Sequence, residues 1–111
     1  ATGVPVVVLR DTPYADVENV PDCVAAHLAD LSACDGGRDR EQADPFAEAA
    51  RALDAPTVQV VDLTDRICRE DTCYSVVGGV VVYFDAGHLS ATFARSLAPA
   101  LREPVAAALR R

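Results

Sequence analysis

Apolar residues occur along this chain in two ways, as short, nearly unbroken runs and as longer stretches in which they recur at every third or fourth position. The short runs are rich in valine and occupy residues 4–9, 57–61 and 80–84, and the second of them includes the polar Gln59. Runs of this kind are typical of strands buried on both faces of a parallel sheet. The pattern therefore predicts three buried strands.

Helical spacing marks the segments between the first two runs. The first such segment is residues 21–34, and a second begins after Asp44, where an aspartate cap precedes Pro45 at the first helical position. Strand, helices and strand in this order call for a right-handed crossover in a parallel sheet. Residues 35–42 are polar, contain two glycines and are predicted to form a surface loop.

The C-terminal segment carries an apolar side chain at every fourth position. This repeat runs from Leu89 to Leu109, with Ser90 as the predicted helix start, and both Pro99 and Pro104 fall inside it. An interior proline costs a helix about 3 kcal/mol. We therefore predict two or three helical pieces, which cover one face of the sheet.

Candidate chemistry lies directly after the third run. The turn-type sequence Asp85, Ala86, Gly87 follows residues 80–84, and His88 comes next. A spacing of three positions on a turn puts the carboxylate and the imidazole on one face. A carboxylate that holds one imidazole nitrogen leaves the other free as a base, which is the orienting half of a serine hydrolase triad. The alternative is that Asp85 caps a helix beside an exposed histidine.

The loop after the first strand supplies weaker candidates. Arg10 and Asp11 lie there, and ligands of open α/β sheets collect at the carboxyl ends of strands. The alternative is that Asp11 and Pro13 only shape a turn. Asp62, at the end of the second strand, has a helix cap as its more ordinary role. We assign no function to His27.

Four cysteines constrain the fold. A continuous helix from Cys23 to Cys34 would separate their Cα atoms by roughly 16 Å, whereas a disulfide needs them within about 7 Å. If these two are bonded, the helix must end early and turn back. Local pairing favours Cys23 with Cys34 and Cys68 with Cys73, each contributing about 2–3 kcal/mol. The alternative is a zinc site that combines thiolates with a histidine, for which the cysteine spacings are a poor match.

Composition and charge limit the kinds of molecule that we expect this chain to bind. The chain has 111 residues and a formal net charge of −7, and all ten of its basic side chains are arginine, so electrostatics give no reason to expect nucleic acid as a partner. The length suits one small domain over residues 1–111. We expect no cofactor. No apolar run approaches the roughly 18–20 residues that span a bilayer, and disulfides would imply an oxidising compartment.

The order of these motifs resembles a known family. A Cys-x4-Cys pair, a strand ending Val-x-Tyr-x-Asp-x-x-His-Leu-Ser and an Ala/Leu-rich helix are similar to the last block of the SGNH hydrolase superfamily. More narrowly, they resemble the extracytoplasmic SGNH domain fused to bacterial membrane acyltransferases of the acyltransferase-three type. The resemblance continues upstream through Val-Val-Leu-Arg-Asp-Thr-Pro-Tyr, Val-Pro-Asp-Cys and Val-Val-Asp-Leu-Thr-x-x-Ile-Cys, and so covers nearly the whole chain.

The resemblance implies a three-layer α/β fold with a partial parallel sheet, of the SGNH or flavodoxin-like type, of which this chain is the C-terminal portion. The superfamily's Gly-Asp-Ser block, and the Gly and Asn blocks of its oxyanion hole, are not in these 111 residues. The implied partner is an upstream segment of the same protein that carries the nucleophilic serine, together with a membrane acyltransferase domain. The implied location is extracytoplasmic, tethered through that membrane domain.

Two functions of different classes follow. In the first, Asp85 orients His88, His88 deprotonates a serine of the upstream segment, and that serine passes an acyl group to a cell-surface glycan or to water. None of the chain's own serines lies in a strand-turn-helix elbow, so the isolated chain should be inactive. These serines are Ser32, Ser75, Ser90 and Ser96. In the second, the chain is a non-catalytic, disulfide-stabilised secreted module whose uncovered sheet edge favours a homodimer.

Overall fold

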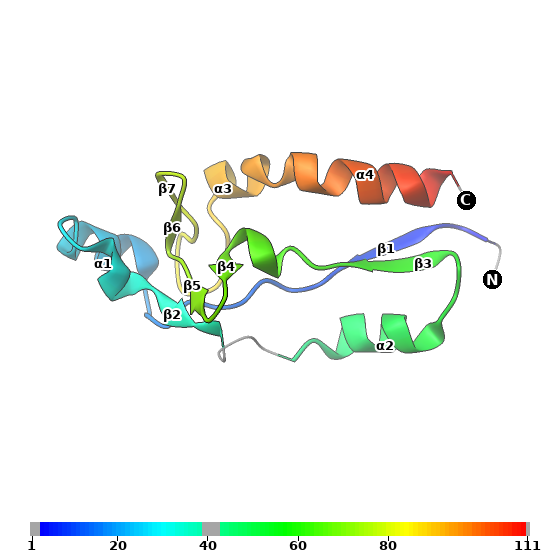
Figure 1. Cartoon of the computed structure of the whole chain (residues 1–111), viewed down its shortest axis with the longest axis horizontal. Coiled ribbons are helices and arrows are strands. Elements are labelled where there is room, and N and C mark those ends of the chain that lie inside the picture. Colours follow the sequence, from blue (N-terminus) through cyan, green and yellow to red (C-terminus); the bar gives the residue numbers. More distant parts are fainter. Residues whose placement is uncertain (1–2, 39–42, 111) are drawn as a thin grey trace.

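A parallel pair of strands runs through one end of the molecule. In the computed structural model, which describes residues 3–38 and 43–110, β1 (Val6–Leu9) lies parallel to β3 (Val58–Val61). Helix α2 (Pro45–Leu53) lies in the connection between them (Figure 1). Two strands and their parallel pairing are confirmed for the first two apolar runs. The predicted burial on both faces is wrong for β1, where Val8 is buried but Val6 and Leu9 are 44% and 49% exposed, because one side of the strand is left uncovered.

Helix α2 begins where the sequence predicts. The Asp44 carboxylate accepts a hydrogen bond from the Ala47 N–H at 3.0 Å, and Pro45 occupies the first helical position. The helix ends at Asp54, which adopts a left-handed conformation with φ 48°. Ala47 and Ala50 form the buried side of α2 and pack beside β1.

The first helix ends early, as a bond between its cysteines requires. Helix α1 spans Val20–Ala26, with the Asn19 side chain as its cap. The chain then turns back through the 3-10 helix η1 (Leu31–Cys34). As a result, the Cα atoms of Cys23 and Cys34 lie 5.9 Å apart and the two sulfurs are bonded.

A second, antiparallel sheet carries the other cysteine pair. Its strands, in spatial order, are β2 (Gly36–Gly37), β5 (Thr72–Cys73) and β4 (Cys68–Arg69), and the 3-10 helix η3 (Thr64–Arg66) leads into it. Cys68 and Cys73 lie opposite each other and are bonded. Part of the predicted loop over residues 35–42 is thus a strand, while residues 39–42 lie outside the described residues.

The third apolar run contributes to a hairpin instead of forming one long strand. Strands β6 (Val76–Val77) and β7 (Val80–Val81) pair antiparallel around two glycines with φ values of 58° and 77°. Positive φ at both turn positions favours glycine. The prediction of a strand over residues 80–84 is therefore wrong in extent, because β7 ends at Val81, where its pairing with the short strand β6 also ends. Beyond β7 the chain is irregular, and Tyr83 bridges to Leu89.

The C-terminal segment forms two helices, as predicted. Helix α3 (Ala91–Ser96) is capped by Ser90, whose hydroxyl accepts a helix N–H at 3.2 Å. Helix α4 (Ala98–Leu109) begins just before Pro99. Pro104, which we expected to interrupt it, lies inside α4 without ending it, since a proline removes only its own N–H bond when the helix can absorb the ring.

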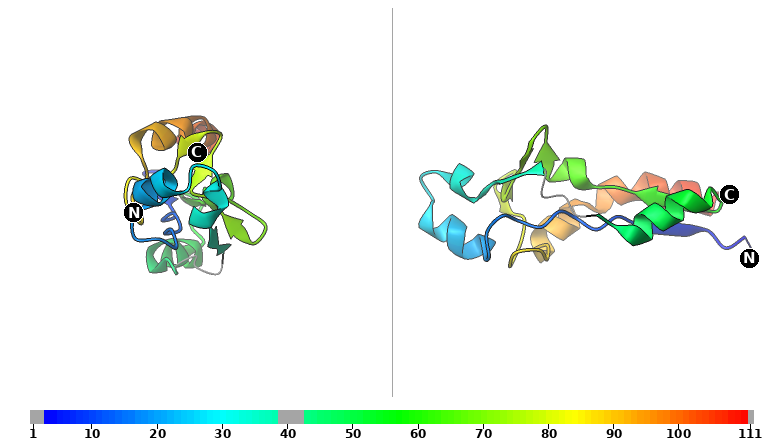
Figure 2. Two further views of the ribbon diagram at one scale, coloured as in Figure 1. Left: turned by 90° about the vertical axis from the view of Figure 1, so that its left-hand side faces the viewer. Right: turned by 90° about the horizontal axis from the view of Figure 1, so that it is seen from below.

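The molecule is long and narrow. It measures 53 × 24 × 22 Å, and its radius of gyration is 15.8 Å, against about 13 Å for a compact domain of this length. Figures 1 and 2 show the β1–β3 pair between α4 on one side and α2 on the other. The architecture is thus α/β, with small parallel and antiparallel sheets. Within residues 3–38 and 43–110, no helix combines the length and hydrophobicity that crossing a bilayer takes.

Candidate active site

The loop that follows β7 folds around the Asp85 carboxylate. Oxygen Oδ1 accepts the backbone N–H of Gly87 at 2.8 Å and that of His88 at 2.7 Å. Oxygen Oδ2 lies 2.7 Å from Nδ1 of the His88 ring. Three donors therefore converge on one carboxylate, and the sequence-predicted contact between Asp85 and His88 is present. Asp85 is not a helix cap, since Ser90 caps α3.

The converging donors keep Asp85 ionised. The N–H of His88, the N–H of Gly87 and then the imidazole lower the pKa of Asp85 from 3.8 to about 2. An ionised carboxylate can only accept hydrogen bonds, so the nitrogen facing it must carry a proton. Neutral His88 is therefore protonated at Nδ1, and Nε2 keeps its lone pair. The His88 side chain is 74% exposed, which leaves the imidazole accessible.

Phe84 stacks on the imidazole. The two ring centroids are 5.5 Å apart and the ring planes differ by 21°. The backbone N–H of Phe84 also donates to the His88 carbonyl at 3.0 Å. This stack restricts rotation of the imidazole and places an exposed apolar surface beside it. The stacking of Phe84 on His88 was not predicted from the sequence. The alternation of strand residues, with Tyr83 buried and Phe84 exposed, is the signal that could have indicated it.

The segment over residues 13–20 supports the loop. The buried Tyr83 hydroxyl donates to the Pro13 carbonyl, and burial raises the pKa of Tyr83 to about 12. The backbone N–H groups of Ala15 and Val20 donate to loop carbonyls at 2.8 and 3.3 Å. A segment distant in sequence thus fixes the loop at three points, which the sequence pattern did not reveal.

Tyr14, in the same segment, lies against Gly87. A Cβ atom at Gly87 would come within 2.9 Å of the Tyr14 ring, closer than side chains pack. Gly87 is therefore required by close approach of the two segments rather than by its own backbone conformation.

The two second-tier candidates take part in contacts at the ends of β1 and β3. The nearly buried Arg10 has its Nε 3.7 Å from Asp62 Oδ2. The Asp11 N–H donates to the Asp44 carboxylate at 2.8 Å, at the start of α2. Asp62 accepts the backbone N–H of Thr64 at 2.9 Å, but Leu63 rather than Asp62 occupies the N-cap position of η3. These bonds brace the ends of the strands, and the residues that hold Asp85 and His88 are different ones.

Comparison with known families agrees with the motif order. Residues 1–103 match the family model described as SGNH domain (fused to AT3 domains). The chain belongs to this family. No curated protein and no solved structure matches it. The matched residues of this SGNH domain include both disulfides and the whole loop that carries Asp85 and His88.

The serine hydroxyls of this SGNH domain are all engaged away from His88. Their acceptors are the Asp30 carboxylate for Ser32 and the carbonyls of Cys34 for Ser75, Val81 for Ser90 and Phe93 for Ser96. A hydroxyl has one proton to donate. Therefore none of the four, all within the described residues, directs its proton to the imidazole.

The other histidine of the SGNH domain lies beside the first disulfide. Nδ1 of His27 is 3.7 Å from Cys23 Sγ, 4.0 Å from Cys34 Sγ and 2.8 Å from the Cys23 carbonyl oxygen. Since all four sulfurs are paired in disulfides, the group offers no thiolate to a zinc ion. The bond to the carbonyl is a local packing contact.

Proposed function

We propose that this SGNH domain supplies the Asp-His half of a Ser-His-Asp triad in an extracytoplasmic acyltransferase or esterase that acts on a cell-surface glycan. The observation that carries the proposal is the 2.7 Å contact between Asp85 Oδ2 and His88 Nδ1 on an exposed loop. In the reaction, Nε2 of His88 takes the proton of the attacking hydroxyl, Asp85 stabilises the imidazolium, and the proton then passes to the leaving group. The low pKa of Asp85 keeps it ionised throughout.

The nucleophile belongs to an upstream segment of the same protein in this proposal. Its support is the engagement of all four serine hydroxyls within the chain. The upstream serine accepts an acyl group supplied through the membrane domain and becomes an ester. His88 then removes the proton of a sugar hydroxyl, that oxygen attacks the ester, and serine leaves as the regenerated alcohol. Water in place of the sugar gives hydrolysis.

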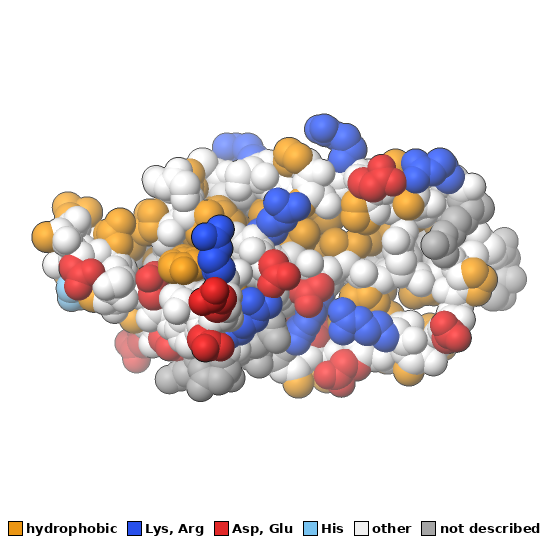
Figure 3. Space-filling view, viewed as in Figure 1, with side chains coloured by type: hydrophobic (Ala, Val, Ile, Leu, Met, Phe, Trp, Pro, Cys, Tyr) orange, Lys and Arg blue, Asp and Glu red, His pale blue; other side chains and the backbone are white. Residues whose placement is uncertain are grey.

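We further propose that the upstream segment completes a three-layer SGNH fold around β1 and β3. Helices α2 and α4 already lie on opposite sides of these strands (Figures 1 and 2). Figure 3 shows hydrophobic side chains gathered between α4 and β3. An apolar cavity of about 370 Å³ opens between β1, β3 and α2, and Phe46 at its rim is 73% exposed. An uncovered apolar face of this kind favours a covering partner.

The same proposal places the domain outside the cytoplasm. Two disulfides within 111 residues fit an oxidising compartment. The family's fusion to AT3 domains supports a membrane tether formed by another part of the same protein.

The test compares the two histidines in the full-length parent protein. Aryl-ester hydrolysis and acyl transfer to a glycan acceptor are measured for His88→Ala and for the matched control His27→Ala. We expect about a 10³-fold loss of turnover for the first variant, because general base catalysis is removed, and full turnover for the second. Unchanged turnover in His88→Ala removes this histidine from the mechanism.

A non-catalytic binding or assembly module is the second candidate, and the exposed apolar face favours it. In that case the chain alone associates through this face, and sedimentation of the isolated domain gives a dimer that Phe46→Asp dissociates. A parent protein whose turnover depends on His88 rules this candidate out as the complete function.

A further inference from the structure

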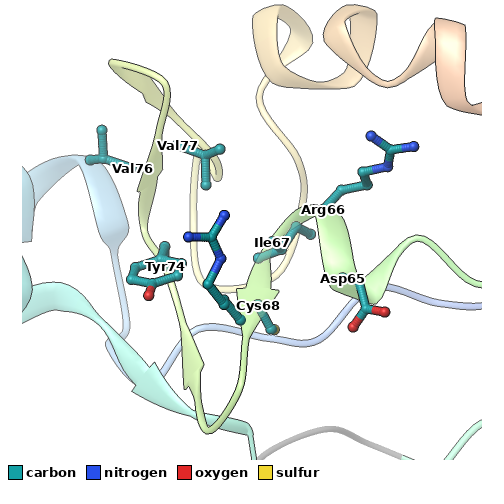
Figure 4. Close-up of a pocket in the computed structure, with 8 residues that line it drawn as sticks. Asp65, Arg66, Ile67, Cys68, Tyr74, Val76 and Val77 are labelled. Atoms are coloured by element: carbon teal, nitrogen blue, oxygen red, sulfur yellow. The ribbon is translucent and has the colours of Figure 1, made fainter.

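A pocket that the proposed reaction does not use lies between η3, β4 and the β6–β7 hairpin. Its volume is about 280 Å³ (Figure 4). Both views in Figure 2 place the β4–β5 turn on the opposite side of the molecule from the loop that follows β7. The pocket is therefore separate from the Asp85–His88 pair.

The floor of the pocket is apolar and rigid. Ile67 and Cys68 line it, and both belong to the larger buried cluster, with Cys68 fixed by its disulfide. Figure 4 shows Tyr74 and Arg66 on opposite sides of the hollow, with Ile67 between them. The half-buried Tyr74 ring offers an aromatic surface with a polar tip. Such a wall suits a ligand that has one apolar face and several polar edges.

Two exposed arginines, Arg66 and Arg69, line the same pocket. Within residues 3–38 and 43–110, neither forms an ion pair. The one carboxylate of the lining, that of Asp65, is already held by Arg38. The lining thus includes two exposed arginines, although the chain as a whole has a net charge of −7. In Figure 4 the Arg66 side chain extends away from Tyr74 at the edge of the hollow.

The geometry points to a site for one anionic sugar residue, and we propose that this pocket binds a sugar that bears a carboxylate or a phosphate. Guanidinium groups pair with both anions through two parallel hydrogen bonds. Ligand pockets usually measure about 300–1,000 Å³, so a volume of about 280 Å³, just below this range, admits no more than a single ring-sized unit. In this proposal the site holds a glycan away from Asp85 and His88. The proposal rests on the residues that line the pocket, so it does not depend on the proposed acyl transfer.

The first test titrates the 111-residue chain with D-glucuronate, glucose 6-phosphate and neutral glucose, observed through backbone N–H signals. We expect saturable shifts confined to residues 66–69 and 74–77 with at least one of the anionic sugars, and a much weaker response to glucose. A response to glucuronate alone assigns the carboxylate, and a response to the phosphate alone assigns the phosphate. No saturable shift, or an equal response to glucose, overturns the proposal.

The second test separates the pocket from general charge. Arg66→Gln and Arg69→Gln should each weaken binding at least about tenfold, because a charge-assisted hydrogen bond is lost. The control Arg95→Gln removes the same charge from the exposed surface of α3 and should bind as the unaltered chain does. Thermal unfolding verifies that each variant folds. Equal weakening by all three variants contradicts the site, whereas unchanged binding by Asp85→Asn shows that it is independent of the proposed reaction.

Discussion

The two ends of this SGNH domain are held together to different degrees. The end with the Asp85–His88 loop has the larger hydrophobic cluster, both disulfides and the buried Tyr83 hydroxyl. The end with β1, β3 and α2 has a buried cluster of only three described residues and exposes Phe46. The chain therefore fixes its candidate catalytic pair with its own residues, while its strand pair lacks a complete core.

This difference means that the chain forms the Asp85–His88 contact alone, whereas its β1–β3 end needs a covering partner. The Asp85 carboxylate and the His88 imidazole are in contact within the chain itself, so this pair forms without a partner. The exposed apolar face, in contrast, is the surface on which the rest of the domain would pack.

The largest expected effect is a difference between the isolated chain and the parent protein. Phe46→Ala should change the free energy of unfolding of the isolated chain by less than about 0.5 kcal/mol, because the ring is exposed. In the parent protein, with the apolar face covered, the same change should cost about 3 kcal/mol. Urea unfolding of both proteins measures the difference.

The matched control for that experiment is Phe93→Ala at the other end. Phe93 is buried in the larger cluster, so its loss should cost about 3–5 kcal/mol in both proteins. If Phe46→Ala costs the same small amount in both, the apolar face is not covered and the comparison between the two ends fails.

The second prediction concerns the Cys68–Cys73 disulfide, at the end of the molecule that carries the Asp85–His88 loop. Replacing Cys68 and Cys73 together by alanine should lower the free energy of unfolding by about 2 kcal/mol, because the unfolded chain gains the entropy that the short loop removes. Urea unfolding measures it, and mass measurement after alkylation verifies that Cys23 and Cys34 stay paired. A loss below about 0.5 kcal/mol would mean that the cysteine sheet is held by other contacts.

The third prediction concerns the hydroxyl beneath the loop. Tyr83→Phe removes the donor to the buried Pro13 carbonyl and should cost about 1–2 kcal/mol. Hydrogen exchange should also quicken at the Ala15 N–H, which donates to the loop. Tyr14→Phe, at a partly exposed ring, is the control and should stay within about 0.5 kcal/mol. Equal effects of the two variants would mean that the Tyr83 hydrogen bond does not hold the loop.

The fourth prediction is the pH range in which the loop keeps its shape. The pKa of Asp85 is lowered to about 2 in the folded chain. The ionised carboxylate therefore contributes its full stabilisation above pH 3.8, and this contribution is lost as the pH falls through about 2. In His88→Ala the pKa should remain well below 3.8, because the two largest causes are backbone N–H groups that alanine keeps. Carbon-13 titration of the Asp85 carboxyl group measures its pKa in the unaltered chain and in His88→Ala. A midpoint near pH 3.8 in the unaltered chain contradicts the loop geometry.

Local signals in the sequence were sufficient for much of the fold. The Asp44-Pro45 pair predicted the start of α2, and the valine runs predicted the parallel pairing of β1 and β3. The spacing of Cys23 and Cys34 required α1 to end early. Each of these depends on residues close together in sequence or on one covalent constraint.

One local turn and several long-range contacts account for what the sequence did not reveal. The strand expected over residues 80–84 stops at β7 because two glycines create a hairpin whose partner is the preceding strand. At the candidate site, the contact of Asp85 with His88 followed from their spacing. The support from Pro13 to Val20 did not, because backbone carbonyls and N–H groups at distant positions leave no pattern in side chains.

The most direct test of the central claim is the tautomer of His88, measured by nitrogen-15 chemical shifts of the neutral ring. The account predicts the proton on Nδ1, facing an ionised Asp85. In Asp85→Asn the amide oxygen keeps the two backbone N–H groups and the NH₂ faces the ring, so the proton should move to Nε2. A proton on Nε2 in the unaltered chain, or the same tautomer in both, would show that Asp85 does not orient the base.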